Sequence, residues 1–217
     1  MNKTVSRLKI NSVIKAVILA EMLLWSGWNF IMPIFSIYIT QLPDGSIEKA
    51  ATSFSIYLFA RVVFGLLSGK VLNKKRARYK FFVLMLGMSI LSFSYLGLAF
   101  SKNVEGVYFF YAVIGFALGI ASPAKNSLFS NNINKEKSTL IWGALDAGVF
   151  LSMAVSTIVG GFIAQKFGFE ILFFIAAAIN ILAIIPYILY IRYFRNTTIE
   201  PKVAFTRPVL SEVCDDE

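Results

Sequence analysis

Long apolar runs constrain this sequence more than any other feature. A transmembrane helix needs about 20 mainly apolar residues to cross the hydrocarbon core, and the sequence contains six runs of that length. Short segments with turn-forming or charged residues separate them, such as QLPDGS, NKKRAR and QKFG. The runs are Val13–Thr40, Ala50–Lys70, Phe81–Ser101, Val107–Ser130, Ser138–Ala164 and Phe169–Tyr193.

The fold class predicted from these runs is an all-α membrane protein with six transmembrane helices. Residues 13–194 form the transmembrane domain, because no linker or soluble domain interrupts the runs. A basic leader, residues 1–12, precedes it. A tail, residues 195–217, contains two prolines and ends in acidic residues, so we expect it to be disordered and cytoplasmic.

Positive charge is distributed unevenly between the two sides of the predicted bundle. Sixteen lysines and arginines fall in the leader, in the loops after the second and fourth runs, and in the tail. The opposite loops carry three, Lys49, Lys102 and Lys166. This asymmetry predicts that both termini are cytoplasmic. The densest cluster would meet anionic lipid rather than nucleic acid, and its members are Lys70, Lys74, Lys75, Arg76, Arg78 and Lys80.

Four ionisable residues lie inside the apolar runs: Glu21, Arg61, Lys125 and Asp146. At about 1.5 Å of rise per residue they share one layer in the cytoplasmic half of the bundle. Each would cost on the order of 3 kcal/mol or more if it faced lipid. They are therefore expected to pair or to line an aqueous cavity, either as structural ion pairs or as a gate or proton pathway.

One face of the first run is rich in polar and aromatic side chains. Glu21, Trp25, Trp28 and Met32 recur at helical spacing, with Asn29 beside them. Because an indole N–H needs a partner, two tryptophans beside an acid indicate a polar cavity wall, although ordinary bundle packing is an equal alternative. Pro33 removes a backbone donor, so we expect a kink there.

Glycines mark the ends of two helices and suggest internal repeats. Gly65 and Gly69 precede one positively charged turn and a Phe-rich helix, and Gly160 and Gly161 precede another. This weak similarity predicts two three-helix repeats, residues 13–101 and 107–194, inverted relative to each other in the membrane. The pair Gly115 and Gly119 forms a GxxxG spacing that permits close helix contact.

These residues resemble the major facilitator superfamily. The segment from Arg61 through Gly65, Gly69 and Lys70, followed by Lys74 and Lys75, is similar to the family motif between its second and third helices. The later runs GFALGIASPAKNSL and GALDAGVFLSMAVSTIVGGFIAQKFGFEILF also resemble the family, nearest to its arabinose-efflux and drug-efflux branch. Three positions depart from family patterns: Gly69 replaces an aspartate, Tyr111 an arginine, and Ser156-Thr157 a Gly-Pro pair.

The resemblance implies a partner, because family members normally have two six-helix halves facing each other across an axis along the membrane normal. We expect a parallel homodimer with this two-fold axis. The family's contact between the second and fifth helices would then place Arg61 near the partner's Asp146, as a cytoplasmic gate. An in-chain alternative pairs Glu21 with Arg61 and Lys125 with Asp146.

The function expected from these features is transport of a small molecule by alternating access, with proton coupling open. By resemblance, the first and fourth helices line the cavity with Glu21, Trp25, Trp28, Asn29, Lys125 and Asn126. An enzyme is not expected, because the sequence shows no nucleophile–base arrangement and has no histidine, and no metal or cofactor is predicted. The alternative is a non-transporting subunit or scaffold that pairs with a different half. The expected location is the inner membrane of a prokaryote.

Overall fold

A computed structural model describes residues 12–133 and 135–189, and the regular elements within those ranges are all helices. The all-α prediction is therefore confirmed for this part of the chain. The predicted leader and tail lie outside the described residues, except for Ser12. The elements are α1 (Ser12–Ile31), η1 (Met32–Ile34), α2 (Phe35–Thr40), α3 (Ile47–Leu72), α4 (Ala77–Ala99), α5 (Val104–Ser130), η2 (Lys135–Lys137) and α6 (Ser138–Leu182), and residues 184–189 are also helical.

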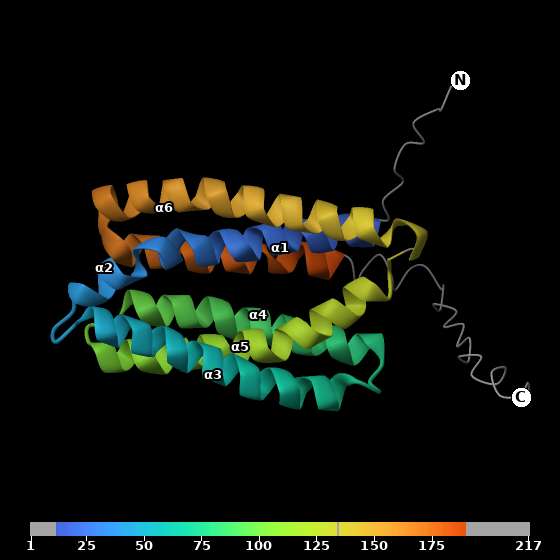
Figure 1. Cartoon of the computed structure of the whole chain (residues 1–217), viewed down its shortest axis with the longest axis horizontal. Helices are drawn as coiled ribbons and strands as arrows, with labels where there is room; N and C mark the ends of the chain where they lie inside the picture. Colours follow the sequence, from blue (N-terminus) through green and yellow to red (C-terminus); the bar gives the residue numbers. More distant parts are fainter. Residues whose placement is uncertain (1–11, 134, 190–217) are drawn as a thin grey trace, which may run out of the picture.

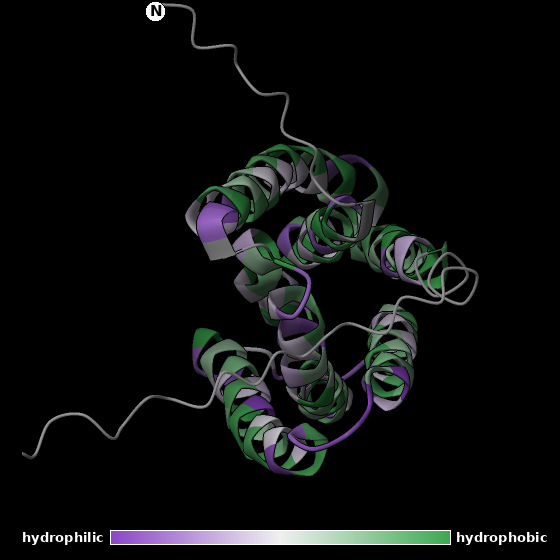
Figure 2. Ribbon diagram, turned by 90° about the vertical axis from the view of Figure 1, so that its right-hand side faces the viewer, coloured by the Kyte–Doolittle hydropathy of each residue, from purple (hydrophilic) through white to green (hydrophobic). Residues whose placement is uncertain are grey.

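Among the described residues, five helical stretches are long and apolar enough to cross a membrane. The first four correspond to the first four predicted runs, with ends that differ by a few residues. The last one, Ser138–Leu189, combines the fifth and sixth predicted runs. Many large apolar side chains are exposed, as expected where the surrounding solvent is lipid. Hydrophobic residues predominate along the helices (Figure 2).

The kink predicted at Pro33 is confirmed. The 3₁₀ turn η1, with Pro33 near its start, separates α1 from the short helix α2. Tyr38 then anchors α2, because its hydroxyl donates to the carbonyl oxygens of Leu98 (3.3 Å) and Ser101 (3.4 Å) at the end of α4. The same ring meets Phe173 edge-on at 4.9 Å. The C-terminal end of the first membrane-spanning stretch is thus fixed against α4 and α6.

The helix α6 is divided by Gly168, which has a non-helical backbone at φ 85° and ψ 171°. An unbroken helix of 45 residues would be roughly 68 Å long, about twice the thickness of the hydrocarbon core. The positive φ is a conformation that glycine adopts without steric cost. The chain turns back at this point, so that a first arm, residues 138–167, lies beside a second arm, which comprises residues 169–182 of α6 and the helical residues 184–189 (Figure 1).

Contacts with α1 establish the directions of the two arms. On the first arm, Ser152 donates to the carbonyl of Met22 at 3.1 Å, and Gly160 lies against the backbone of Phe30. Both numbers rise together, so this arm runs parallel to α1. On the second arm, the residue numbers of the partners decrease as those of α1 increase. Glu21 is hydrogen-bonded to Tyr187, and Gly27, further along α1, lies against Asn180. The second arm is therefore antiparallel to α1.

The helices form two packed groups. In one, α1 packs against both arms of α6; in the other, α3 and α4 pack against α5 (Figure 1). Contacts between α4 and α6 join the groups. The GxxxG prediction of close contact is confirmed, since a Cβ at Gly115 would lie 2.3 Å from the carbonyl oxygen of Tyr57 on α3.

Candidate functional site

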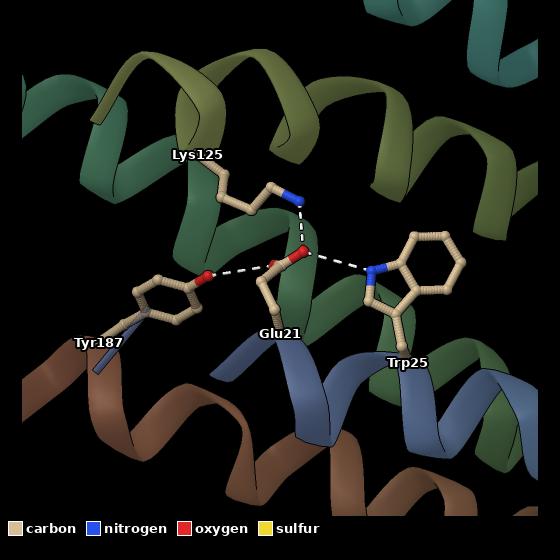
Figure 3. A network of polar contacts seen from close by, with 4 residues as sticks. All are labelled: Glu21, Trp25, Lys125 and Tyr187. Carbon is tan, nitrogen blue, oxygen red and sulfur yellow. Dashed lines mark hydrogen bonds and ion pairs between the residues drawn. The ribbon is translucent and has the colours of Figure 1, made fainter. Parts of the chain in front are cut away.

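The carboxylate of Glu21 is the centre of a buried polar network (Figure 3). Glu21 lies on the face of α1 that meets α6, and it is 3% exposed. Its Oε2 forms an ion pair with Nζ of Lys125 at 2.5 Å and accepts a hydrogen bond from Nε1 of Trp25 at 3.3 Å. Its Oε1 accepts a hydrogen bond from the Tyr187 hydroxyl at 3.4 Å. Three donors therefore hold one intramembrane carboxylate.

The ion pair joins the two helix groups. Lys125 belongs to α5, whereas Glu21 belongs to α1, and these two helices are not among the closely packed pairs of the described structure. The four-carbon stem of the lysine spans the space between them (Figure 3). The Lys125 side chain is 18% exposed and that of Glu21 is 4% exposed. The cation is thus the member of the pair that reaches toward open space.

That space is a cavity of about 310 Å³ between α1, α5 and the first arm of α6. It has three ionisable groups in its wall, together with aromatic and aliphatic side chains. Asp146 is exposed and has no ion pair among the described residues. The lining residues are Glu21, Trp25, Lys125, Asn126, Trp142, Leu145, Asp146, Val149, Phe150 and Met153.

The predicted cavity residues separate into two sets. Four of them, Glu21, Trp25, Lys125 and Asn126, line this cavity. Trp28 does not, and its ring instead lies 4.8 Å from that of Tyr57 on α3. Asn29 is buried and donates to the carbonyl oxygen of Trp25 at 3.0 Å.

Arg61 lies apart from the carboxylates. It is half-buried on α3, and its Nη1 donates to the hydroxyl of Tyr57, while its guanidinium carbon is 5.8 Å from the centre of the same ring. Of the four ionisable residues predicted to pair, the structure therefore joins Glu21 with Lys125 within one chain. The in-chain alternative that paired Glu21 with Arg61 and Lys125 with Asp146 is not observed.

The predicted loop motif lies at the far end of α3. Lys70 is in the last turn of this helix, and Lys74 and Lys75 follow in the exposed turn before α4. The backbone of Gly65 lies 3.1 Å from where a Cβ of Gly119 would be, whereas a Cβ at Gly69 would meet nothing within 4 Å.

The charge cluster requires one correction. The sequence predicts that Lys80 belongs to the loop cluster that meets anionic lipid, but it lies inside α4 and is 8% exposed. Its Nζ donates to Oγ of Ser127 on α5 at 2.7 Å. The alkyl stem of a lysine packs readily in an apolar contact while its ammonium finds a polar partner, so this residue helps to join α4 with α5.

Sequence reasoning missed the aromatic part of the cavity. Trp142 precedes Asp146 by four residues on α6, and Val149, Phe150 and Met153 follow it by three, four and seven residues. Residues at these spacings share one face of a helix. The pattern around Asp146 therefore indicates a cavity wall in the same way as the pattern around Glu21. Tyr187 had no comparable signal, because its position beside Glu21 depends on how the second arm packs.

An internal ion pair, an exposed carboxylate and an aromatic cavity among apolar helices define an integral, multi-pass membrane protein with a polar internal site. The described residues contain no group of three acidic, histidine or cysteine side chains that could hold a metal ion.

The family follows from comparison of the sequence with known proteins. Residues 17–213 match the model of the Major Facilitator Superfamily, and the chain belongs to that family. This confirms the family that the loop motif and the later helices indicated. The family is a transporter family and not an enzyme class.

Two relatives illustrate the branch. The chain is 24% identical over 170 residues to Multidrug resistance protein MdtG of Proteus mirabilis, covering 76% of this chain and 41% of the relative. It is 26% identical over 188 residues to Multi-drug resistance efflux pump PmrA of Streptococcus pneumoniae, covering 85% of this chain and 46% of the relative. The chain thus spans less than half the length of these relatives.

A solved structure supports the fold. The POT family transporter PepTSo superposes with a TM-score of 0.69 at 16% identity, covering 89% of this chain and 40% of the other. At that identity the similarity concerns the fold alone.

Proposed function

We propose that this protein transports small amphipathic molecules across a prokaryotic inner membrane by alternating access, as a parallel homodimer of six-span halves. The observation that carries this proposal is the cavity in which Glu21, Lys125 and Asp146 lie among apolar helices. Ionisable side chains inside a membrane mark substrate or ion pathways. The names of the two relatives favour drug export over import.

The proposed topology has six spans because each arm of α6 crosses the membrane once. Gly168 would then lie at the outer surface, and the turn between α3 and α4 at the cytoplasmic surface, where its basic residues satisfy the positive-inside rule. The two predicted three-helix repeats remain part of this proposal. They would account for the similar glycine-rich ends of α3 and of the first arm of α6.

Exposure of α3 supports a second copy of the chain. In the most apolar window of α3, 17% of the residues are buried, compared with 44 to 50% in the other four stretches. Arg61 on this helix has no carboxylate partner in the described part of the chain. A two-fold axis along the membrane normal would bring Arg61 to the partner's Asp146 in two equivalent pairs. Glu21 and Lys125 do not require the partner, because they pair within one chain.

The charges of the cavity favour a cationic substrate with an apolar body. Lys125 neutralises Glu21, so Asp146 is the carboxylate whose charge is left over within one chain. It would be open to a substrate when its pair with the partner's Arg61 parts. Aromatic rings at Trp25, Trp142 and Phe150 line the same space, and such rings attract cations through their faces. Proton coupling belongs to the proposal as well, with Asp146 as the carboxylate open to the cavity.

Transport is tested with purified protein in liposomes. Ethidium, an aromatic cation, should cross protein-containing liposomes faster than empty ones, and carboxyfluorescein, an aromatic anion of similar size, should not. A proton gradient should accelerate ethidium if transport is proton-coupled. Equal permeability of the two kinds of liposome to ethidium would refute the proposed substrate class.

The homodimer is tested by charge reversal. Arg61→Asp and Asp146→Arg should each reduce the yield of crosslinked dimer, and the double variant should recover it. Failure of the double variant to recover the crosslinked dimer would refute the intermolecular gate. A chain that remains single in lipid nanodiscs would favour the alternative, a subunit that pairs with a different half.

A further inference from the structure

We infer that Tyr187 is a positioning residue, which holds the carboxylate of Glu21 in the orientation that faces Lys125 and the cavity. The inference rests on the proposed function, since it deepens the role of the same site. It concerns the second arm of α6, which contributes no residue to the cavity wall described above. Tyr187 acts through Glu21 and does not touch the cavity itself.

The distribution of donors between the two carboxylate oxygens supports this role. Lys125 and Trp25 both bind Oε2, at 2.5 and 3.3 Å. The χ3 angle of a glutamate has a broad distribution, so the carboxylate can rotate about its last bond. Donors bound to one oxygen alone leave the other oxygen free to change position. Tyr187 donates to Oε1 at 3.4 Å (Figure 3). A donor at each oxygen fixes the plane of the carboxylate.

The backbone explains why a tyrosine can reach this oxygen. At Gly27, a Cβ would lie 2.2 Å from Nδ2 of Asn180 and 3.3 Å from the carbonyl oxygen of Ala176. Glycine is therefore needed for the second arm to approach α1 so closely. Counting six residues back along α1 and seven forward along the antiparallel arm leads from this contact to Glu21 and Tyr187. Seven residues are about two helical turns, which would place Asn180 and Tyr187 on one face of an unbroken helix. The hydrogen bond to Glu21 shows that Tyr187 stays on that side of the arm despite the short break described next.

A local break precedes Tyr187. The helix α6 ends at Leu182, and the chain is helical again over residues 184–189. Pro186 has no N–H with which to bond the carbonyl of Leu182, which accounts for an interruption at this position. Tyr187 is nevertheless 2% exposed, so its ring is enclosed by the protein and its hydroxyl stays beside Glu21.

This arrangement gives Tyr187 a specific task during transport. When a cationic substrate displaces Lys125, or a change of conformation moves it away, Glu21 retains donors from its own helix and from the second arm. Without the tyrosine hydroxyl, the carboxylate would rotate after Lys125 leaves, and the pair would reform more slowly. Loss of the hydroxyl should therefore lower the maximum transport rate more than the apparent substrate affinity.

The first test measures the position of the carboxylate without transport. The chain has three tryptophans, so Trp28→Phe with Trp142→Phe leaves Trp25 as the single indole. Ultraviolet resonance Raman then reports the hydrogen bond of its Nε1–H. Glu21→Ala gives the reference position of the Raman band when the indole has lost its acceptor. Tyr187→Phe should move the band toward that position. The control is Tyr38→Phe, which removes another buried hydroxyl, bonded to backbone carbonyls, and should leave the band unchanged. An unchanged band in Tyr187→Phe would overturn the inference.

Two further variants keep the test decisive if Tyr187→Phe does not fold. Tyr187→4-fluorophenylalanine fills the space of the hydroxyl without a donor, and Tyr187→4-aminophenylalanine retains a donor at the same ring position. The first should shift the Trp25 band and the second should keep it. The inference is wrong if both variants behave alike.

The second test measures ethidium transport in liposomes with the otherwise native chain. Tyr187→Phe should lower the maximum rate about tenfold, as expected for loss of one hydrogen bond to a charged group, with an apparent KM within about twofold. If the wild-type chain moves ethidium and Tyr187→Phe does so at the same rate, the inference fails and the proposed function stands. If the band shifts but the wild-type chain moves no ethidium, the proposed function fails and the positioning of Glu21 stands.

Discussion

Lys125 Nζ lies 2.5 Å from Oε2 of Glu21, and this pair connects α5 with α1 across a space that their backbones do not close. The two residues are 104 positions apart in the chain. A single copy of the protein therefore satisfies two of its four intramembrane ionisable groups. A second copy would supply charge partners only for Arg61 and Asp146. Within the described residues, neither of these two side chains has a partner of opposite charge.

Removing Lys125 should destabilise the protein more than removing an exposed lysine. Lys125→Met leaves a buried carboxylate without its counter-charge, which we expect to lower the free energy of unfolding by about 3 kcal/mol. Adding Glu21→Gln should recover most of that loss, because neither charge then remains. Thermal unfolding in detergent measures both. Lys102→Met, at an exposed turn residue, is the control, and an equal loss of stability there would contradict the prediction.

Adjacent glycines on α6 offer a matched test of the packing against α1. A Cβ at Gly160 would lie 2.4 Å from the carbonyl oxygen of Phe30, whereas a Cβ at Gly161 would meet nothing within 4 Å. Gly160→Ala should therefore lower the free energy of unfolding by about 1 to 3 kcal/mol. Gly161→Ala should be neutral or stabilising by up to about 1 kcal/mol, since alanine favours helices. Similar melting temperatures for the two variants would show that the first arm packs differently.

Much of the helical architecture could be predicted from the sequence, because run length and composition are local properties. The first four helices lie where their apolar runs predicted them, and the 3₁₀ turn lies where Pro33 predicted a kink. The fifth and sixth runs form one element with a bend at Gly168. The segment QKFG contains this glycine, so the place of the break was predictable, although the absence of a longer loop was not.

Asp146 should determine the charge preference of the cavity. Asp146→Asn keeps the size of the side chain and removes the unpaired negative charge, so ethidium transport should fall about tenfold or more, equivalent to roughly 1.4 kcal/mol. Initial rates in liposomes provide the measurement. Asp44→Asn is a suitable control, because Asp44 lies in an exposed turn with φ 58°, a conformation that asparagine tolerates. Equal transport by wild type and Asp146→Asn would exclude this carboxylate from substrate recognition.

The orientation of the chain can be measured by labelling single cysteines. Starting from Cys214→Ser, which removes the one native cysteine, Lys102→Cys and Lys74→Cys place thiols in exposed turns at opposite ends of α4. A membrane-impermeant maleimide added to intact cells should label the first variant and not the second. After permeabilisation, both should react. The reverse pattern in intact cells would place the basic turn outside and contradict the positive-inside assignment.

The candidate site was less predictable than the helices, because ion pairing depends on which faces meet. The sequence indicated that Glu21, Arg61, Lys125 and Asp146 share a layer, but depth does not choose partners. Glu21 pairs with Lys125 because α1 and α5 present these side chains to the same space, while Arg61 is turned toward Tyr57 on its own helix. Tyr187 could be placed only once the contact between Gly27 and Asn180 was known.

The glycines of α5 bring the main chain of α3 into direct contact with the helix that carries Lys125. Cβ atoms at Gly115 and Gly119 would lie 2.3 Å from the carbonyl oxygen of Tyr57 and 3.1 Å from that of Arg61. Because this close backbone contact leaves little room for one helix to slide past the other, we expect the two helices to move as one rigid body. Any motion that widens the space around Lys125 would then also move Arg61. A single displacement would change the positions of both cations relative to their carboxylates.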